Sequence, residues 1–171
     1  PRVLNDQGKA TLFTGPYVNT RDPMVLVLNN LYYCYYMGHK QNDQYDSAIF
    51  CRTSHDLLDW SEPVMVSAGG SPDKKSNWYG GDAECPFVVH KDGLFYLFRN
   101  QLYGANNLNT QYCSPNPLNF GVGDDDRFMI GELPVAAPEI ILHNGHWYIA
   151  ALKPSLKGIR IARLKWIPAD K

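Results

Sequence analysis

The sequence lacks long apolar runs: its hydrophobic stretches are strand-sized, far below the roughly 20 residues that a membrane-spanning helix needs. It also lacks any run of lysine or arginine, and its 16 basic and 17 acidic residues give a formal net charge of −1. A nucleic-acid-binding protein typically carries a basic patch, which is missing here. We therefore expect neither nucleic acid nor an anionic membrane as a main partner.

The four cysteines form no CxxC pair, and their wide spacing argues against a metal cage. Cys34, Cys51 and Cys113 stand among apolar strand residues, which favours buried free thiols. A Cys34–Cys51 cross-strand bridge is the alternative, and the disulfide status of all four, including Cys85, is left open. The acidic stretch at residues 123–128 lacks the alternating ligand pattern of a calcium loop. The sequence thus predicts no metal and no cofactor.

Helical periodicity is also missing, whereas aromatic residues make up 13% of the chain. The 14 glycines and 12 prolines supply frequent turn signals between short aromatic segments. This composition predicts a nearly all-β chain made of many short strands.

Three segments of the chain share one frame. Each contains a proline, an apolar strand, a turn, and a tyrosine ten residues after the proline. The turns contain Asn-Asn, Asp-Gly and Asn-Gly, and the last two are strong signals for tight hairpins. The pairs are Pro23 and Tyr33, Pro86 and Tyr96, and Pro138 and Tyr148.

A third strand follows each hairpin, and fourth, outer strands follow the first two. Four antiparallel strands that recur in this way are typical of a propeller blade. We expect one all-β domain over residues 1–171, with about three four-stranded antiparallel blades at about 15–68, 81–134 and 135–168. An irregular β-sandwich is the alternative. Because propellers typically have four to eight blades, we expect part of a longer protein, whose open blade edges offer a route to self-association.

Carboxylates stand at the starts of two of the three frames. The first strand of a propeller blade lines the central channel, so residues just before each repeated proline converge on one funnel. Asp22 and Glu84 occupy these positions in the first two frames, and alanines occupy them in the third. Acids are depleted in strands. Two converging carboxylates are what glycoside hydrolysis requires.

The motifs "TRDPMV", "SHDLLDW" and "ECPFVV" occur in that order between residues 20 and 89. In this order they resemble the β-fructofuranosidase group, glycoside hydrolase family 32, which has a five-bladed propeller. The related family 43, which acts on arabinosides and xylosides, is similar and is the close alternative. The resemblance covers most of residues 15–115 and implies a carbohydrate substrate. It also suggests a secreted or periplasmic protein, although the sequence itself leaves the localisation unknown.

The resemblance to family 32 implies roles for individual residues. Glu84 is the general acid/base, and Asp22 stabilises the transition state with help from Arg21. The nucleophile of that family lies on the preceding blade, and no matching motif is found; Asn5-Asp6 fits a turn better. Under the family 43 alternative, Asp22 is the general base of an inverting reaction and Glu84 is the acid.

Three further residues precede Glu84 and could bind substrate. Trp78 and Tyr79 offer aromatic faces for stacking on a sugar, although core packing is an equal alternative. Asp82 stands two residues before Glu84, and a solvated loop acid is its plainer interpretation. A chain with the acid but without the nucleophile could also be a non-catalytic carbohydrate-binding propeller. The sequence does not specify the sugar, its linkage, or retaining versus inverting chemistry.

Overall fold

The computed structural model describes residues 20–39, 47–74, 83–123 and 126–167, and in these ranges the regular structure is almost entirely β. Its helical turns are the short 3-10 segments η1 (Ser71–Lys74) and η2 (Gly104–Asn106). Within the described ranges, no helix is apolar and long enough to pass through a bilayer. The strands are β1 (Arg21–Leu28), β2 (Leu31–His39), β3 (Ser47–Ser54), β4 (Val64–Ser67), β5 (Glu84–Lys91), β6 (Leu94–Leu102), β7 (Leu108–Ser114), β8 (Met129–Leu133), β9 (Ala136–His143), β10 (His146–Leu152) and β11 (Ile159–Arg163).

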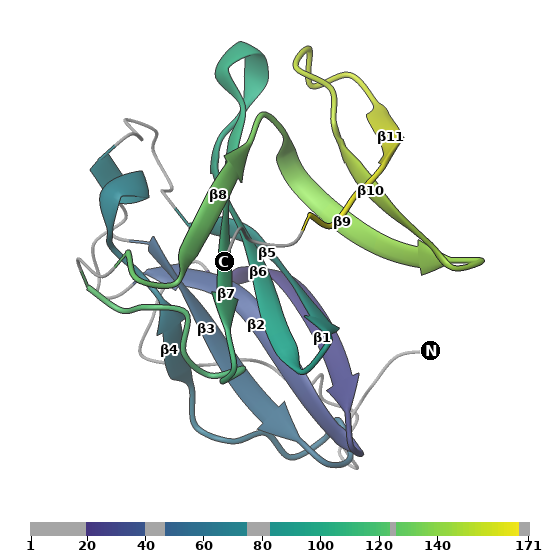
Figure 1. The fold of residues 1–171 in the computed structure, drawn as a ribbon. Helices are drawn as coiled ribbons and strands as arrows, with labels where there is room; N and C mark the ends of the chain where they lie inside the picture. Colours follow the sequence, from purple (N-terminus) through teal and green to yellow (C-terminus); the bar gives the residue numbers. More distant parts are fainter. Residues whose placement is uncertain (1–19, 40–46, 75–82, 124–125, 168–171) are drawn as a thin grey trace.

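These strands form three antiparallel sheets whose strands follow the order of the chain. The first sheet contains β1 to β4, the second contains β5 to β8, and the third contains β9 to β11. Figure 1 shows them in sequence, from purple-blue through teal to yellow-green. The predicted all-β chain of four-stranded units is confirmed, except that the third sheet has three strands in the described part of the chain.

The hairpins that begin each sheet turn as the sequence predicts. Both central residues of each turn have a positive φ, which is the geometry of a type I′ turn and matches the right-handed twist of the strands. Asparagine, aspartate and glycine tolerate this conformation better than other residues. The turn residues are Asn29 and Asn30, Asp92 and Gly93, and Asn144 and Gly145.

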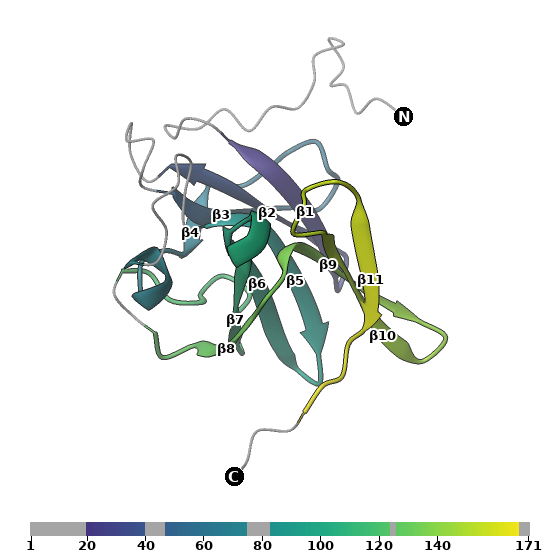
Figure 2. The ribbon, with the colours of Figure 1, turned by 90° about the horizontal axis from the view of Figure 1, so that it is seen from above.

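The sheets pack face to face in chain order, with β1 against β5 and β5 against β9. Figure 2 shows the same arrangement from above. The largest core cluster joins the first two sheets and contains the fully buried Tyr35, Ile49 and Leu97. A smaller cluster, which includes Phe98 and Ile149, joins the second and third sheets. Burial between sheets therefore holds the three strand starts at β1, β5 and β9 close together.

The cysteines are free thiols, so the alternative of a Cys34–Cys51 bridge is wrong. Cys34 lies opposite Arg52 on the neighbouring strand, whereas Cys51 lies opposite Tyr35. These are adjacent cross-strand pairs, and the side chains of adjacent pairs point to opposite faces of a sheet. The two thiols accordingly belong to different core clusters. Burial raises the pKa of Cys34 to about 12. Cys113 differs from the expectation because it is only partly buried.

Candidate active site

The first strands of all three sheets begin with the same unusual backbone. Asp22, Cys85 and Ala137 have φ values of 57°, 43° and 46°, and each stands directly before a proline. The register of the sheet shifts at each of these points. A positive φ is uncommon outside glycine, and residues in such conformations cost on the order of 1 kcal/mol or more. The surrounding structure must hold these three starts in place.

Side chains from the preceding sheet provide that support at two of the starts. The Cys85 N–H donates to Asp22 Oδ2 at 3.2 Å, which links the second sheet to the first. The Ala137 N–H donates to Asn100 Oδ1 at 3.0 Å, which links the third sheet to the second. Asp22 therefore has a structural role as a hydrogen-bond acceptor, in addition to any role toward substrate.

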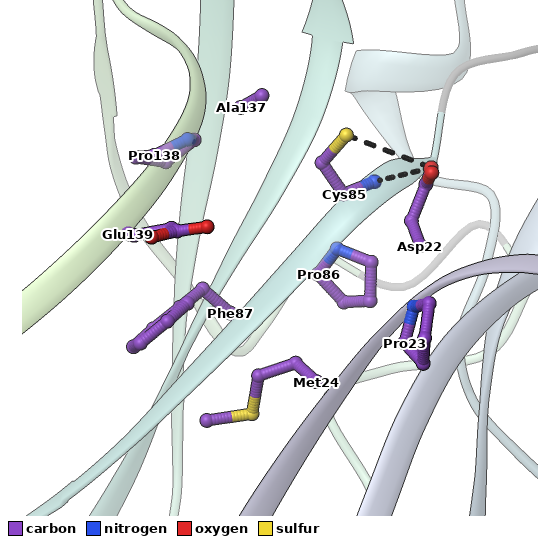
Figure 3. Close-up of a pocket in the computed structure, with 9 residues that line it drawn as sticks. All are labelled: Asp22, Pro23, Met24, Cys85, Pro86, Phe87, Ala137, Pro138 and Glu139. Atoms are coloured by element: carbon purple, nitrogen blue, oxygen red, sulfur yellow. Dashed lines mark hydrogen bonds between the residues drawn. The ribbon is translucent and has the colours of Figure 1, made fainter. Parts of the chain in front are cut away.

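A cavity of about 420 Å³ lies where the three strand starts converge (Figure 3). Each sheet contributes one tripeptide in the same frame, namely the residue with positive φ, the proline and the residue after it. We refer to this cavity as the funnel, because it lies at the strand starts that the repeat frame predicts to converge. The lining residues are Asp22, Pro23 and Met24; Cys85, Pro86 and Phe87; and Ala137, Pro138 and Glu139.

The two predicted catalytic acids meet at Arg21. The Arg21 guanidinium donates through Nη2 to Glu84 Oε1, and its Nε lies 3.7 Å from Asp22 Oδ2. The Arg21 side chain is 34% exposed, and that of Asp22 is 26% exposed, whereas that of Glu84 is 6% exposed. One cation therefore connects a solvent-accessible carboxylate to a buried one.

Glu84 does not occupy the position equivalent to Asp22. In the repeat frame Asp22 corresponds to Cys85 and Ala137, whereas Glu84 corresponds to Arg21. Glu84 is buried and is absent from the residues that line the cavity.

Tyr103 adds a hydroxyl group that the sequence interpretation missed. Its Oη lies 3.2 Å from Cys85 Sγ, and Cys85 Sγ lies 3.5 Å from Asp22 Oδ2. Burial, followed by the neighbouring Cys85 and Glu84, raises the pKa of Tyr103 well above its usual range. Burial likewise raises the pKa of Cys85 to about 12, so its thiol remains a proton donor to Asp22. Tyr103 follows β6, outside the repeat frame, and no sequence signal marked it.

The other predicted substrate-binding residues, Trp78, Tyr79 and Asp82, lie outside the described residues. Within the described ranges, no group of three histidine, cysteine or acidic side chains could hold a metal ion. The described part of the site therefore consists of Arg21, Asp22, Glu84, Cys85 and Tyr103 around the funnel.

The structural role of Asp22 can be separated from its charge. Asp22→Asn keeps an oxygen acceptor for the Cys85 N–H and tolerates a positive φ, so we expect stability close to the wild type. Asp22→Ala removes the acceptor and puts alanine, which tolerates a positive φ less well than aspartate, at this position, so we expect a loss of about 1–3 kcal/mol. Urea unfolding followed by tryptophan fluorescence measures both variants. Equal losses in the two variants would contradict this role for the acceptor.

No protein-family model matches the sequence, and no curated protein matches it. Solved structures do resemble the fold. A thermostable family-43 glycoside hydrolase matches 87% of this chain with a TM-score of 0.62 and 16% identity, over 55% of its own length. An exo-β-1,3-galactanase from Phanerochaete chrysosporium matches 96% of this chain with a TM-score of 0.61 and 16% identity, over 38% of its own length. An α-L-arabinofuranosidase from Clostridium thermocellum matches 90% of this chain with a TM-score of 0.55 and 18% identity, over 53% of its own length.

The chain thus spans about half or less of the length of these structures. Identities of this size show the fold alone. The predicted fold class is confirmed: the chain consists of β-propeller blades, with the fold of the glycoside hydrolases that it resembles.

Proposed function

We propose that the chain carries part of the active site of a glycoside hydrolase that acts on furanosides or related oligosaccharides, as β-fructosidases do. The observation that supports this most is Arg21, which contacts both Asp22 and Glu84 beside a cavity lined by three strand starts. The three sheets are consecutive blades of one propeller domain in this proposal, and the sugar enters along the axial funnel.

In the proposed reaction Glu84 donates a proton to the glycosidic oxygen as the bond to the anomeric carbon breaks. Positive charge then develops on the sugar ring, and the Asp22 carboxylate stabilises it from the funnel. Arg21 contacts both acids, so it positions their side chains relative to each other. In the second half of a retaining reaction, Glu84 takes a proton from the attacking water.

The retaining version also needs a carboxylate nucleophile. The third strand start offers Ala136 and Ala137 in the positions of the acids, so it does not supply one there. On the resemblance to family 32, the nucleophile comes from a blade that precedes Arg21 in the chain. A hydrolytic site then requires residues beyond those described.

An inverting, family 43-like reaction is a second candidate, because family-43 glycoside hydrolases have the same fold. Here Asp22 takes a proton from water as that water attacks the anomeric carbon, and Glu84 protonates the leaving oxygen. Only these two carboxylates are then needed. Asp22 is partly exposed in the cavity, which suits a residue that activates water.

A non-catalytic carbohydrate-binding propeller is the third candidate. The Asp22 carboxylate already accepts a backbone hydrogen bond, and Glu84 is buried in an ion pair. Both contacts would keep the funnel rigid in a protein that binds a sugar without cleaving it. This candidate and the hydrolase differ in whether a bound sugar is cleaved.

The test is to incubate the protein with fructo-, arabino-, xylo- and galacto-oligosaccharides and follow the products by proton NMR. Release of a monosaccharide supports the hydrolase, and the first anomer to appear separates retention from inversion. Binding without release supports the non-catalytic candidate. The proposal fails if none of these sugars is cleaved or bound.

A further inference from the structure

Glu139 brings a third carboxylate into the funnel. It follows Pro138 as Met24 follows Pro23 and Phe87 follows Pro86, so these three residues form one ring of the cavity lining. Figure 3 shows its side chain among the residues that line the cavity. At this level two of the three strands place an apolar side chain and the third places an acid.

Unlike the other two acids, Glu139 makes no hydrogen bond or ion pair with a described residue. Its side chain is exposed, whereas Asp22 and Glu84 both contact Arg21. Around the described funnel, the Arg21 guanidinium therefore contacts two of the three carboxylates, and Glu139 is not one of them. The cavity lining itself contains Asp22 and Glu139 but no basic residue. The described cavity thus has an excess of negative charge.

The ring also offers an apolar surface. Phe87 and Met24 line the cavity at the same level as Glu139. An aromatic ring packs well against the C–H face of a sugar. A carboxylate accepts hydrogen bonds from hydroxyl groups, and such charge-assisted bonds are short and strong. An acceptor beside an apolar wall suits a hydroxyl-rich sugar without charge.

We propose that Glu139 is a specificity-determining residue that selects uncharged sugars and excludes uronates and sulfated sugars from the funnel. This inference rests on the proposed function only in that the cavity takes a sugar. A carboxylate on the ligand would approach two negative charges. Glu139 has no ion-pair partner among the described residues, and Asp22 is only partly neutralised by Arg21. At separations of several ångströms in a partly solvated cavity, this repulsion weakens binding by roughly tenfold.

The test compares wild type, Glu139→Gln and Glu62→Gln on an array of neutral and uronate-containing oligosaccharides. Glutamine keeps the size of the side chain and one oxygen acceptor but removes the charge. Glu62 is an exposed glutamate between β3 and β4 that does not line the cavity, so its variant controls for net charge. Titration calorimetry on the best neutral ligand and its uronate counterpart then gives the ratio of dissociation constants.

The expected result is that wild type and Glu62→Gln prefer the neutral sugar by about tenfold, and that Glu139→Gln reduces this preference to about twofold. The preference of wild type should also shrink in high salt, because screening weakens the repulsion. An unchanged preference in Glu139→Gln overturns the inference, as does a wild type that binds uronates equally well or binds no glycan.

The outcome separates the inference from the proposed function. If the wild type hydrolyses neutral oligosaccharides and Glu139→Gln keeps the full preference for neutral sugars, the proposed hydrolase function is supported. Glu139 then does not determine specificity. A protein that binds neutral sugars selectively through Glu139 and cleaves none supports the inference and removes the hydrolase.

Discussion

Glu84→Gln is expected to lower the hydrolysis of oligosaccharides by a factor of about 10²–10⁴ while sugar binding is nearly unchanged. Glutamine has the shape of glutamate, and its amide oxygen can still accept the hydrogen bond from Arg21. What it lacks is the proton that must reach the glycosidic oxygen. The rate of sugar release and the dissociation constant of the same oligosaccharide measure the two effects separately.

A substrate with a good leaving group provides the control for this role. The 4-nitrophenyl glycoside of the sugar that is released needs little help from an acid, so its bond should break in Glu84→Gln much faster than that of the oligosaccharide. Glu62→Gln should behave as wild type on both substrates, since Glu62 is exposed and lies outside the cavity. Full oligosaccharide activity in Glu84→Gln would remove Glu84 from the reaction. Equal losses on both substrates would indicate a structural role.

The hairpins and the three-sheet pattern could be predicted because their signals are local. Asp92-Gly93 and Asn144-Gly145 favour one turn geometry, and the apolar residues on either side then fix the register of the strands. The repeated proline defines the frame that places Asp22 and Glu84 at the starts of β1 and β5. These features depend on neighbours within about ten residues.

The cavity could be predicted only in outline, because its contacts depend on pairing between sheets. Arg21 and Glu84 are 63 residues apart, and only their position in the packed sheets makes them an ion pair. Tyr103 approaches Cys85 from a loop outside the repeat. No local pattern distinguishes Glu139 from an ordinary strand residue, because only the packing of the three sheets brings the residue after the proline to the funnel.

The local sequence pattern also could not predict which residues of each repeated segment are most deeply buried. The repeated tyrosine Tyr96 is only partly buried and packs edge-on against Trp166, with ring centroids 4.7 Å apart. Its neighbour Leu97 faces the first sheet and is completely buried. Since alternate strand residues face opposite sides, the order of the sheets decides which of the two lies in the larger core.

Leu97→Ala should therefore destabilise the fold more than any surface change, by about 2–5 kcal/mol. Leu97 is 0% exposed and belongs to the core cluster that joins the first and second sheets. The lost methyl groups leave a cavity that cannot close easily, because the side chain sits between two sheets held by their own hydrogen bonds. Urea unfolding gives the change in free energy, provided that the slope of the transition is unchanged.

Val27→Ala is the matched control, because Val27 is 57% exposed on β1 and should change stability by no more than about 0.5 kcal/mol. The comparison tests how the propeller is held together. If the first two sheets are stabilised by their shared core, then loosening that core also loosens the contact of Arg21 with Glu84, which connects the same sheets. Leu97→Ala should accordingly weaken sugar binding at temperatures below its own unfolding transition. A variant that unfolds earlier but binds sugar with unchanged affinity up to that transition would show that the strand starts are held together independently of the core.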